Sequence, residues 1–198
     1  LRNSSAASDV YKRQVEKNIS DVEIINIDLM QGEHKTPEYR AIAPNSRIPA
    51  LRLDDGTVIM ESTAICRYLE SLYPEPNLFG ENPMEIASIE MWQCRVYNEL
   101  MIPLAMGFRH LHPAMAAMEN QNKEYGEAQK QIAIKSLDYF NGVLGESEFV
   151  AGARYTFADI QMITTTDFFI KLNRLELSDY PHIQRHSELM SNRESFKA

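Results

Sequence analysis

The sequence has little cysteine and no long apolar run. Its 198 residues include only two cysteines, Cys66 and Cys94, which lie far apart and form no C-x-x-C pattern. The sequence therefore predicts neither a disulfide framework nor a zinc site. No stretch approaches the roughly 20 consecutive apolar residues that a membrane-spanning helix needs. We expect a soluble protein in a reducing, cytoplasmic setting, without a membrane or a metal as partner.

Basic residues are also scarce. The chain has 20 Lys and Arg against 28 Asp and Glu, which gives a formal charge of -8. This balance argues against nucleic acid as a partner, because a surface that binds phosphates needs an excess of cations. With 44% hydrophobic and 24% charged residues, the composition excludes intrinsic disorder as the main state. Residues 1–14, LRNSSAASDVYKRQ, contain no apolar run and do not form a secretory signal peptide.

The first half of the chain has the pattern of a mixed α/β domain. Residues 21–29, DVEIINIDL, predict a strand because β-branched side chains cluster there. A short helix over 36–43 is indicated by Thr36 as N-cap and Pro37 at the first helical position. The dipeptide Asp55-Gly56 favours a tight turn, so residues 49–60 predict a β-hairpin.

A helix over 62–73 follows, with Ser62 as a possible cap and Ile65, Leu69 and Leu72 as its apolar stripe. Residues 74–83, PEPNLFGENP, combine prolines and a glycine without periodicity and predict a linker. Beyond it we expect helices over 84–118, 124–144, 157–172 and 182–190, with a bend or break at Pro103 or Pro113. This order predicts a helical second domain.

The clearest local signal lies at the start of the third long helix. In YTFADI, Thr156 and Asp159 have the spacing of a capping box, in which each side chain binds the other residue's backbone N–H. This pair predicts a helix start and has no catalytic meaning. The two thiols are expected to be packed inside helices.

Four motifs together resemble the cytosolic glutathione transferases, most closely the phi class and its bacterial relatives. They are GEHKTPEY (32–39), RIPAL (47–51), ESTAICRYLE (61–70) and FVAGARYTFADI (149–160). The resemblance runs from about Val15 to the C-terminus. It implies a thioredoxin-like N-terminal domain, an all-helical C-terminal domain, glutathione as co-substrate and a homodimer.

The resemblance also implies a glutathione site. The backbone of Ile48, before a cis Pro49, would clamp the cysteinyl part of the tripeptide. Ser62 at a helix N-terminus suits the α-carboxylate of the γ-glutamyl end, since helix N-termini bind anions, and Glu61 suits its α-amine. Alone, these residues have plainer interpretations: a trans proline on an edge strand and an ordinary serine cap.

Three further residues complete the implied site. His34 and Lys35 would hold the glycyl carboxylate, although on their own they would be solvated loop residues. Arg47 stands where the phi class commonly has glutamine, so its role is less defined; a guanidinium can still pair with a carboxylate in a bidentate manner.

The catalytic residue is not identified. The family uses serine, tyrosine or cysteine in the first strand–helix turn to hold glutathione as a thiolate, but residues 1–14 do not resemble that segment. We hypothesise that they are a foreign leader that replaces the first strand and most of the first helix. Ser4, Ser5, Ser8 and Tyr11 would then have no catalytic role, and activity would be impaired.

The expected organisation is therefore a leader over 1–14, a partial thioredoxin-like glutathione-binding domain over 15–73, a linker over 74–83 and a helical domain over 84–198. The leading function is conjugation of the glutathione thiolate to electrophilic apolar substrates, as in cytoplasmic detoxification. Two alternatives stay open. One is a non-catalytic binding or regulatory protein of the same fold, and the other is a cysteine-type glutathione-dependent reductase or isomerase.

Overall fold

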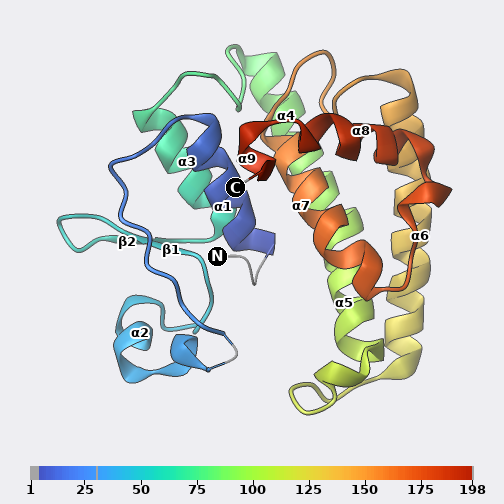
Figure 1. Cartoon of the computed structure of the whole chain (residues 1–198), viewed down its shortest axis with the longest axis horizontal. Coiled ribbons are helices and arrows are strands. Elements are labelled where there is room, and N and C mark those ends of the chain that lie inside the picture. The colour runs from blue at the N-terminus through green and yellow to red at the C-terminus, as the bar shows by residue number, and fades with distance from the viewer. Residues whose placement is uncertain (1–4, 30, 198) are drawn as a thin grey trace. The chain divides into compact units, whose positions relative to one another are not determined.

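In the computed structural model the chain is mainly helical, and its strands form one small hairpin (Figure 1). The structure describes residues 5–29 and 31–197. The chain divides into two compact units: residues 1–78 together with 194–198, and residues 79–193. The division falls inside the segment 74–83, where the sequence predicts a linker. Residues 194–198 belong to the first unit, whereas the sequence prediction places them in the helical domain. The domain limits given above stay a prediction.

The first unit combines a two-stranded antiparallel sheet with helices. Its elements are α1 (Ser5–Glu16), the 3-10 helix η1 (Glu33–Lys35), α2 (Pro37–Ile42), β1 (Ala50–Arg52), β2 (Val58–Met60), α3 (Ser62–Leu72) and α9 (Glu194–Lys197). Among them, α1 packs on α3 and on α9, and α3 packs on both strands. This arrangement agrees with a small thioredoxin-like domain.

The predicted helix α2 and the hairpin are both confirmed. Thr36 caps α2 by accepting the Tyr39 backbone N–H at 3.2 Å, and Pro37 takes the first turn, where its missing N–H costs nothing. Between the strands, Gly56 has φ +86°, a conformation that side chains disfavour. Asp55 Oδ1 accepts the Thr57 N–H at 2.8 Å and tightens the turn. Local turn chemistry therefore sets this part of the fold.

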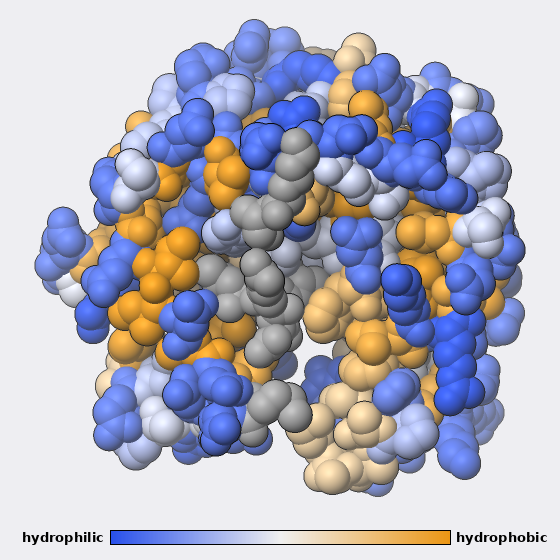
Figure 2. All heavy atoms as spheres, in the orientation of Figure 1, coloured by the Kyte–Doolittle hydropathy of each residue, from blue (hydrophilic) through white to orange (hydrophobic). Residues whose placement is uncertain are grey.

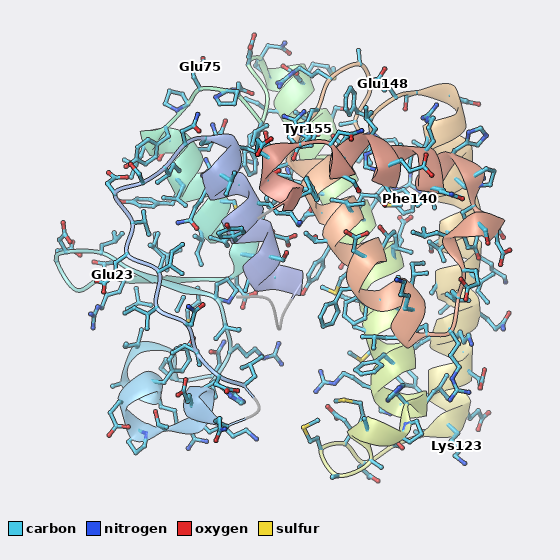
Figure 3. All side chains as sticks on the ribbon, viewed as in Figure 1. Glu23, Glu75, Lys123, Phe140, Glu148 and Tyr155 are labelled. Carbon is cyan, nitrogen blue, oxygen red and sulfur yellow. The ribbon has the colours of Figure 1, made fainter. Side chains whose placement is uncertain are left out.

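The strand predicted over residues 21–29 does not form. Ile24 and Ile25 are 45% and 65% exposed, and this segment joins no ladder. A strand needs a neighbour for its backbone N–H and C=O groups, and the two strands in the described part of the chain pair with each other. Glu23, labelled in Figure 3, marks this segment, and Figure 2 shows apolar surface in the same region.

The prediction that most of the first helix is missing is wrong for the described residues. Helix α1 begins at Ser5, and three of its buried side chains, Ala7, Val10 and Arg13, are spaced three residues apart. That spacing puts them on one helix face, which packs on α3. Ser5, Ser8 and Tyr11 therefore lie within a helix, while Ser4 lies outside the described residues. The foreign origin of residues 1–14 stays a hypothesis.

A buried charge cluster joins α1 to α3. Glu70 of α3 pairs with Arg13 at 2.9 Å and with Lys17, just after α1, at 2.8 Å. Lys17 also donates to the carbonyl oxygens of Tyr73 and Pro76 at 2.6 and 2.7 Å. Burial lowers the pKa of Arg13 and of Lys17, and Glu70 opposes that shift. The three side chains therefore lock the end of α3 to α1.

Only part of the predicted stripe of α3 is buried. Ile65 and Leu69 lie in the core, but Leu72 is 54% exposed because the helix ends there. The thiols also differ from each other. Cys66 on α3 is fully buried, and burial raises the pKa of its thiol well above the usual value. Cys94 is exposed, so the expectation that both thiols are packed is wrong for Cys94.

The second unit is helical, as predicted. Its elements are α4 (Pro83–Arg95), the π-helix η2 (Val96–Met101), α5 (Ile102–Leu111), the 3-10 helix η3 (Pro113–Met115), α6 (Lys123–Glu146), α7 (Phe157–Leu172), the 3-10 helix η4 (Leu177–Asp179) and α8 (Pro181–Ser191). Of the two predicted break points, Pro113 interrupts the helix: α5 ends at Leu111 and η3 begins at Pro113. At Pro103 the chain stays helical, but its hydrogen-bond ladder changes. Because Pro103 has no N–H, the usual ladder cannot continue through it, and the Ile102 N–H donates five residues back to the Tyr97 carbonyl.

Helix α7 lies at the centre of this unit's core. It packs on α4, η2, α5 and α8, and its first ten residues are all buried. Phe140 of α6, labelled in Figure 3, is fully buried in the same core, and its ring lies 6.2 Å from that of Trp92. A helix that is covered on every side needs its polar start satisfied internally.

The predicted capping box does this. The Asp159 carboxylate is fully buried and accepts the Thr156 N–H and hydroxyl at 2.8 and 3.1 Å. Its other oxygen accepts the Val150 N–H at 2.8 Å and lies 2.9 Å from His186 Nε2 on α8. One carboxylate thus ties the start of α7 to the preceding loop and to α8, a role wider than the predicted cap.

Replacing this carboxylate should destabilise the second unit strongly. Asp159→Asn keeps the volume but removes the negative charge and replaces one of the two acceptor oxygens with an NH2 donor, so two of the four buried donors lose their acceptor, and we expect a loss of about 3 kcal/mol or more. Urea unfolding followed by fluorescence of the single Trp92 measures the change. The control is Asp138→Asn on the exposed side of α6, which should stay within about 0.5 kcal/mol of the parent chain. Equal unfolding midpoints for the two variants would contradict this role.

Candidate functional site

The hairpin register brings two of the predicted motifs together. Ala50 pairs with Met60, the last pair on the side of the ladder away from the turn. Paired residues in an antiparallel ladder lie about 5 Å apart. The chain just before Ala50, at Ile48–Pro49, therefore emerges beside the chain just after Met60, at Glu61–Ser62. Sequence separation hides this proximity, which the pairing creates.

The peptide bond between Ile48 and Pro49 is cis, as the family resemblance implies. In the part of the chain that the structure describes, neither the N–H nor the C=O of Ile48 has a hydrogen-bond partner. Both groups are therefore available to an extended ligand that pairs with them as a strand would.

The start of α3 differs by one residue from the prediction. Glu61, rather than Ser62, is the N-cap, and Ser62 is the first helical residue. The first ladder bond of α3 runs from the Ile65 N–H to the Glu61 carbonyl at 3.0 Å. The N–H groups before Ile65 thus have no ladder acceptor, and their partial positive charge suits an anion.

Glu61 has a strained backbone. Its φ of +70° and ψ of 122° lie in a region that favours glycine. Such a conformation costs about 1–3 kcal/mol and concentrates at functional sites. Within the described residues, the Glu61 carboxylate and the Ser62 hydroxyl make no hydrogen bond. The side chains of Glu61 and Ser62 are therefore available to a ligand.

The predicted cationic residues His34 and Lys35 lie just before the N-terminus of α2. His34 and Lys35 are in η1, which packs against α2. The Nδ1 atom of His34 is buried and has no hydrogen-bond partner. Lys35 is exposed, and no acidic group in the described part of the chain pairs with it. Within the described residues, no hydrogen bond or ion pair links these two residues directly to Glu61 or Ser62, so a ligand would have to bridge them.

Arg47 lies between the two groups along the chain. Its backbone N–H donates to Asn45 Oδ1 at 3.2 Å, and its carbonyl accepts from the Tyr39 hydroxyl at 2.8 Å. Its guanidinium is exposed and unpaired among the described residues. Sequence reasoning missed Tyr39 because its partner is eight residues away, across a turn whose path no local pattern gives.

Other candidate chemistry is not supported in this structure. Among residues 5–29 and 31–197, no three His, Cys, Asp or Glu side chains gather as metal ligands. His110 and His112 each use Nδ1 to accept a backbone N–H, from Asn122 and Ala114. Over the same residues, no helix combines the length and apolarity that crossing a bilayer requires.

Comparison with known proteins agrees with this geometry. Residues 15–72 match the family model for the glutathione S-transferase N-terminal domain, and residues 100–194 match the model for the C-terminal domain. The chain belongs to the glutathione S-transferase family. The N-terminal match covers the hairpin and α3, which carry site residues. The C-terminal match covers most of the helical unit.

Individual relatives support the same assignment. Glutathione S-transferase 2 of Saccharomyces cerevisiae is 40% identical over 151 residues, which are 75% of this chain and 65% of that protein. Glutathione S-transferase F10 of Arabidopsis thaliana is 29% identical over 92% of this chain and 86% of its own length. The crystal structure of Gtt2 from Saccharomyces cerevisiae superposes with a TM-score of 0.87 at 34% identity, covering 98% of this chain and 95% of that one.

One relative has a different name. A Pseudomonas aeruginosa protein named maleylacetoacetate isomerase is 25% identical over 187 residues, which are 89% of this chain and 82% of that protein. The family match thus includes more than one named activity.

The strain at Glu61 can be tested by stability alone. Glu61→Gly and Glu61→Ala both remove the carboxylate, but only glycine adopts φ +70° without steric cost. We expect Glu61→Gly to be more stable than Glu61→Ala by about 1 kcal/mol, as measured by urea unfolding monitored by circular dichroism. At Ser71, near the end of α3, the same pair should rank in the opposite order, because glycine weakens helices. An Ala variant at position 61 as stable as the Gly variant would show that this backbone is relaxed.

Proposed function

We propose that this chain binds glutathione in the first unit. The support comes from one juxtaposition: the cis Ile48–Pro49 peptide emerges beside the strained Glu61 and the N-terminus of α3. Glutathione has a thiol-bearing peptide centre with a charged group at each end. A free strand edge, an anion-binding helix N-terminus and a cationic group are the three features that such a ligand requires.

Each site residue has a role that follows from its chemistry. The Ile48 N–H and C=O pair with the cysteinyl backbone, next to Pro49. Ser62 and the first N–H groups of α3 bind the γ-glutamyl α-carboxylate, while Glu61 pairs with the α-ammonium group. His34, Lys35 and Arg47 take the glycyl carboxylate, and the exposed cations of Lys35 and Arg47, which have no partner among the described residues, support this role.

The reaction proposed for this family member is attack of the glutathione thiolate on an electrophilic apolar substrate. The helical unit would hold that second substrate, and the protein would act as a cytoplasmic homodimer in detoxification. Family membership supports these proposals.

The thiolate is the demanding part of this chemistry. A free thiol has a pKa near 8.5, so a donor group must favour the thiolate at neutral pH. The family's donor lies in a strand–helix turn, whereas Ser8 and Tyr11 lie inside α1 here. We therefore propose that the chain binds glutathione but turns substrates over slowly.

A second candidate is isomerase or cysteine-type redox chemistry with the same glutathione site. The relative named maleylacetoacetate isomerase favours it. The described cysteines do not, since Cys66 is buried with a raised thiol pKa and Cys94 lies in the helical unit. The third candidate is a non-catalytic binding protein of the same fold. It predicts no turnover even when a group that stabilises the glutathione thiolate is introduced.

Glutathione binding should depend on Ser62. We expect titration calorimetry to detect reduced glutathione binding to the full chain, and Ser62→Ala to weaken it about tenfold, because a bond to a charged group contributes about 1.5 kcal/mol or more. Ser71→Ala is the matched control: its hydroxyl donates to the Tyr68 carbonyl at 2.6 Å on the same helix. A parent chain that does not bind glutathione would refute the proposed function.

Turnover should be low compared with a relative such as yeast glutathione S-transferase 2. We expect the rate of conjugation of glutathione to chlorodinitrobenzene, measured at pH 6.5 to 7.5, to be lower by about tenfold or more, because one hydrogen-bond donor to the transition state is missing. Raising the pH toward the thiol pKa should recover part of the rate, because more thiolate forms without help. Turnover equal to that of the relative would contradict the proposed impairment, and faster isomerisation of maleylacetoacetate than conjugation would favour the second candidate.

A further inference from the structure

A buried tyrosine reaches the peptide that leads into the proposed glutathione contact. The Tyr39 side chain donates its hydroxyl to the Arg47 carbonyl oxygen at 2.8 Å, and the residue is only 9% exposed. Its own backbone N–H donates to the Thr36 hydroxyl oxygen at 3.2 Å. Tyr39 thus connects the cap of α2 with the loop that enters β1.

Peptide geometry turns this bond into a constraint on Ile48. The Arg47 carbonyl and the Ile48 N–H belong to one planar unit. The bond between Arg47 and Ile48 is trans, since the cis bonds in the described chain lie elsewhere, so the two groups point in opposite directions. When Tyr39 fixes the direction of the carbonyl, it also fixes the direction of the Ile48 N–H.

A second anchor holds the same stretch from the other side. The Arg47 N–H donates to Asn45 Oδ1 at 3.2 Å, so both backbone polar groups of Arg47 are bonded to side chains. The Arg47 guanidinium and the Ile48 N–H have no such partner within the described residues. Groups that a ligand could use are thus left open while the backbone that carries them is fixed.

The Tyr39 hydroxyl suits a permanent donor role. Burial raises the pKa of Tyr39 above its ordinary value, so the hydroxyl keeps its proton at neutral and mildly alkaline pH. A phenylalanine would fill the same space but would leave the Arg47 carbonyl without this donor.

We propose that Tyr39 is a positioning residue for glutathione: it orients the Arg47–Ile48 peptide so that the Ile48 N–H is preset to meet the ligand. This inference rests on the proposed glutathione site and adds a residue that touches no ligand. Presetting a donor raises affinity because the ligand does not have to order the loop on binding.

The test compares two hydroxyl deletions in the full chain. Tyr39→Phe removes the bond to Arg47, and Tyr73→Phe removes a hydroxyl bond to Asp21 Oδ2 at 2.5 Å in the same unit. Calorimetry with reduced glutathione gives the Kd of each protein. We expect Tyr39→Phe to bind about five- to tenfold more weakly than the parent, and Tyr73→Phe to bind like the parent.

A spectroscopic signature separates positioning from general destabilisation. In protein labelled at isoleucine amides, the Ile48 resonance is identified by its loss in Ile48→Val. Without ligand, Tyr39→Phe should shift this resonance strongly, while Tyr73→Phe leaves it in place. Melting temperatures measured alongside show whether either variant has lost its fold.

The outcomes are distinct. A Tyr39→Phe variant that keeps the parent's Kd and Ile48 resonance overturns the inference and leaves the glutathione site intact. Equal weakening by both variants also overturns it, because the effect would then be global. If the parent does not bind glutathione, the proposed function fails and the positioning role for glutathione fails with it; an Ile48 resonance that still shifts only in Tyr39→Phe would then show only that Tyr39 orients the Arg47–Ile48 peptide.

Discussion

The antiparallel pairing of β1 with β2 is the constraint on which the candidate site depends. Three residue pairs around Asp55-Gly56 set the register, and this register decides what lies beside the cis Ile48–Pro49 peptide. A shift by one residue would exchange the faces of each strand and move Glu61–Ser62 away from Ile48. The site is thus a consequence of a short ladder and of the two chain segments that continue beyond it.

In each unit, one buried carboxylate connects neighbouring helices. In the first unit, Glu70 receives Arg13 and Lys17 and connects α1 with α3. In the second, Asp159 serves the start of α7, the loop at Val150 and α8. Removing the shared carboxylate of either group takes an acceptor away from several buried donors, which is more costly than a lost surface ion pair. Both clusters are therefore specific joints between helices.

The family assignment and the local geometry support the same function from different directions. The N-terminal family match covers the hairpin and α3, where the unpaired backbone and the strained Glu61 lie. Backbone strain at a residue whose carboxylate has no partner in the described chain is explained if a ligand supplies that partner. In the helical unit, by contrast, the buried residues Asp159 and His186 stabilise the start of α7.

Local patterns in the sequence determined several parts of this protein. Thr36–Pro37, Asp55-Gly56, Pro113 and the Thr156/Asp159 pair each act within a few residues, so the helix starts, the turn, the helix break and the capping box could be predicted. The site residues at 48–49 and 61–62 were recognised through their motifs, and hairpin pairing explains why they belong together.

The tertiary structure alone decided what depends on partners far apart in the chain. Residues 21–29 have the composition of a strand but lack a neighbour to pair with in the described chain. Residues 5–14 look unlike a core helix, yet α3 supplies the surface and the Glu70 charge that bury one face of α1. Tyr39 finds the Arg47 carbonyl only after the chain has turned. Backbone propensity is local, whereas burial and pairing require a second segment, and the sequence does not state where that segment will be.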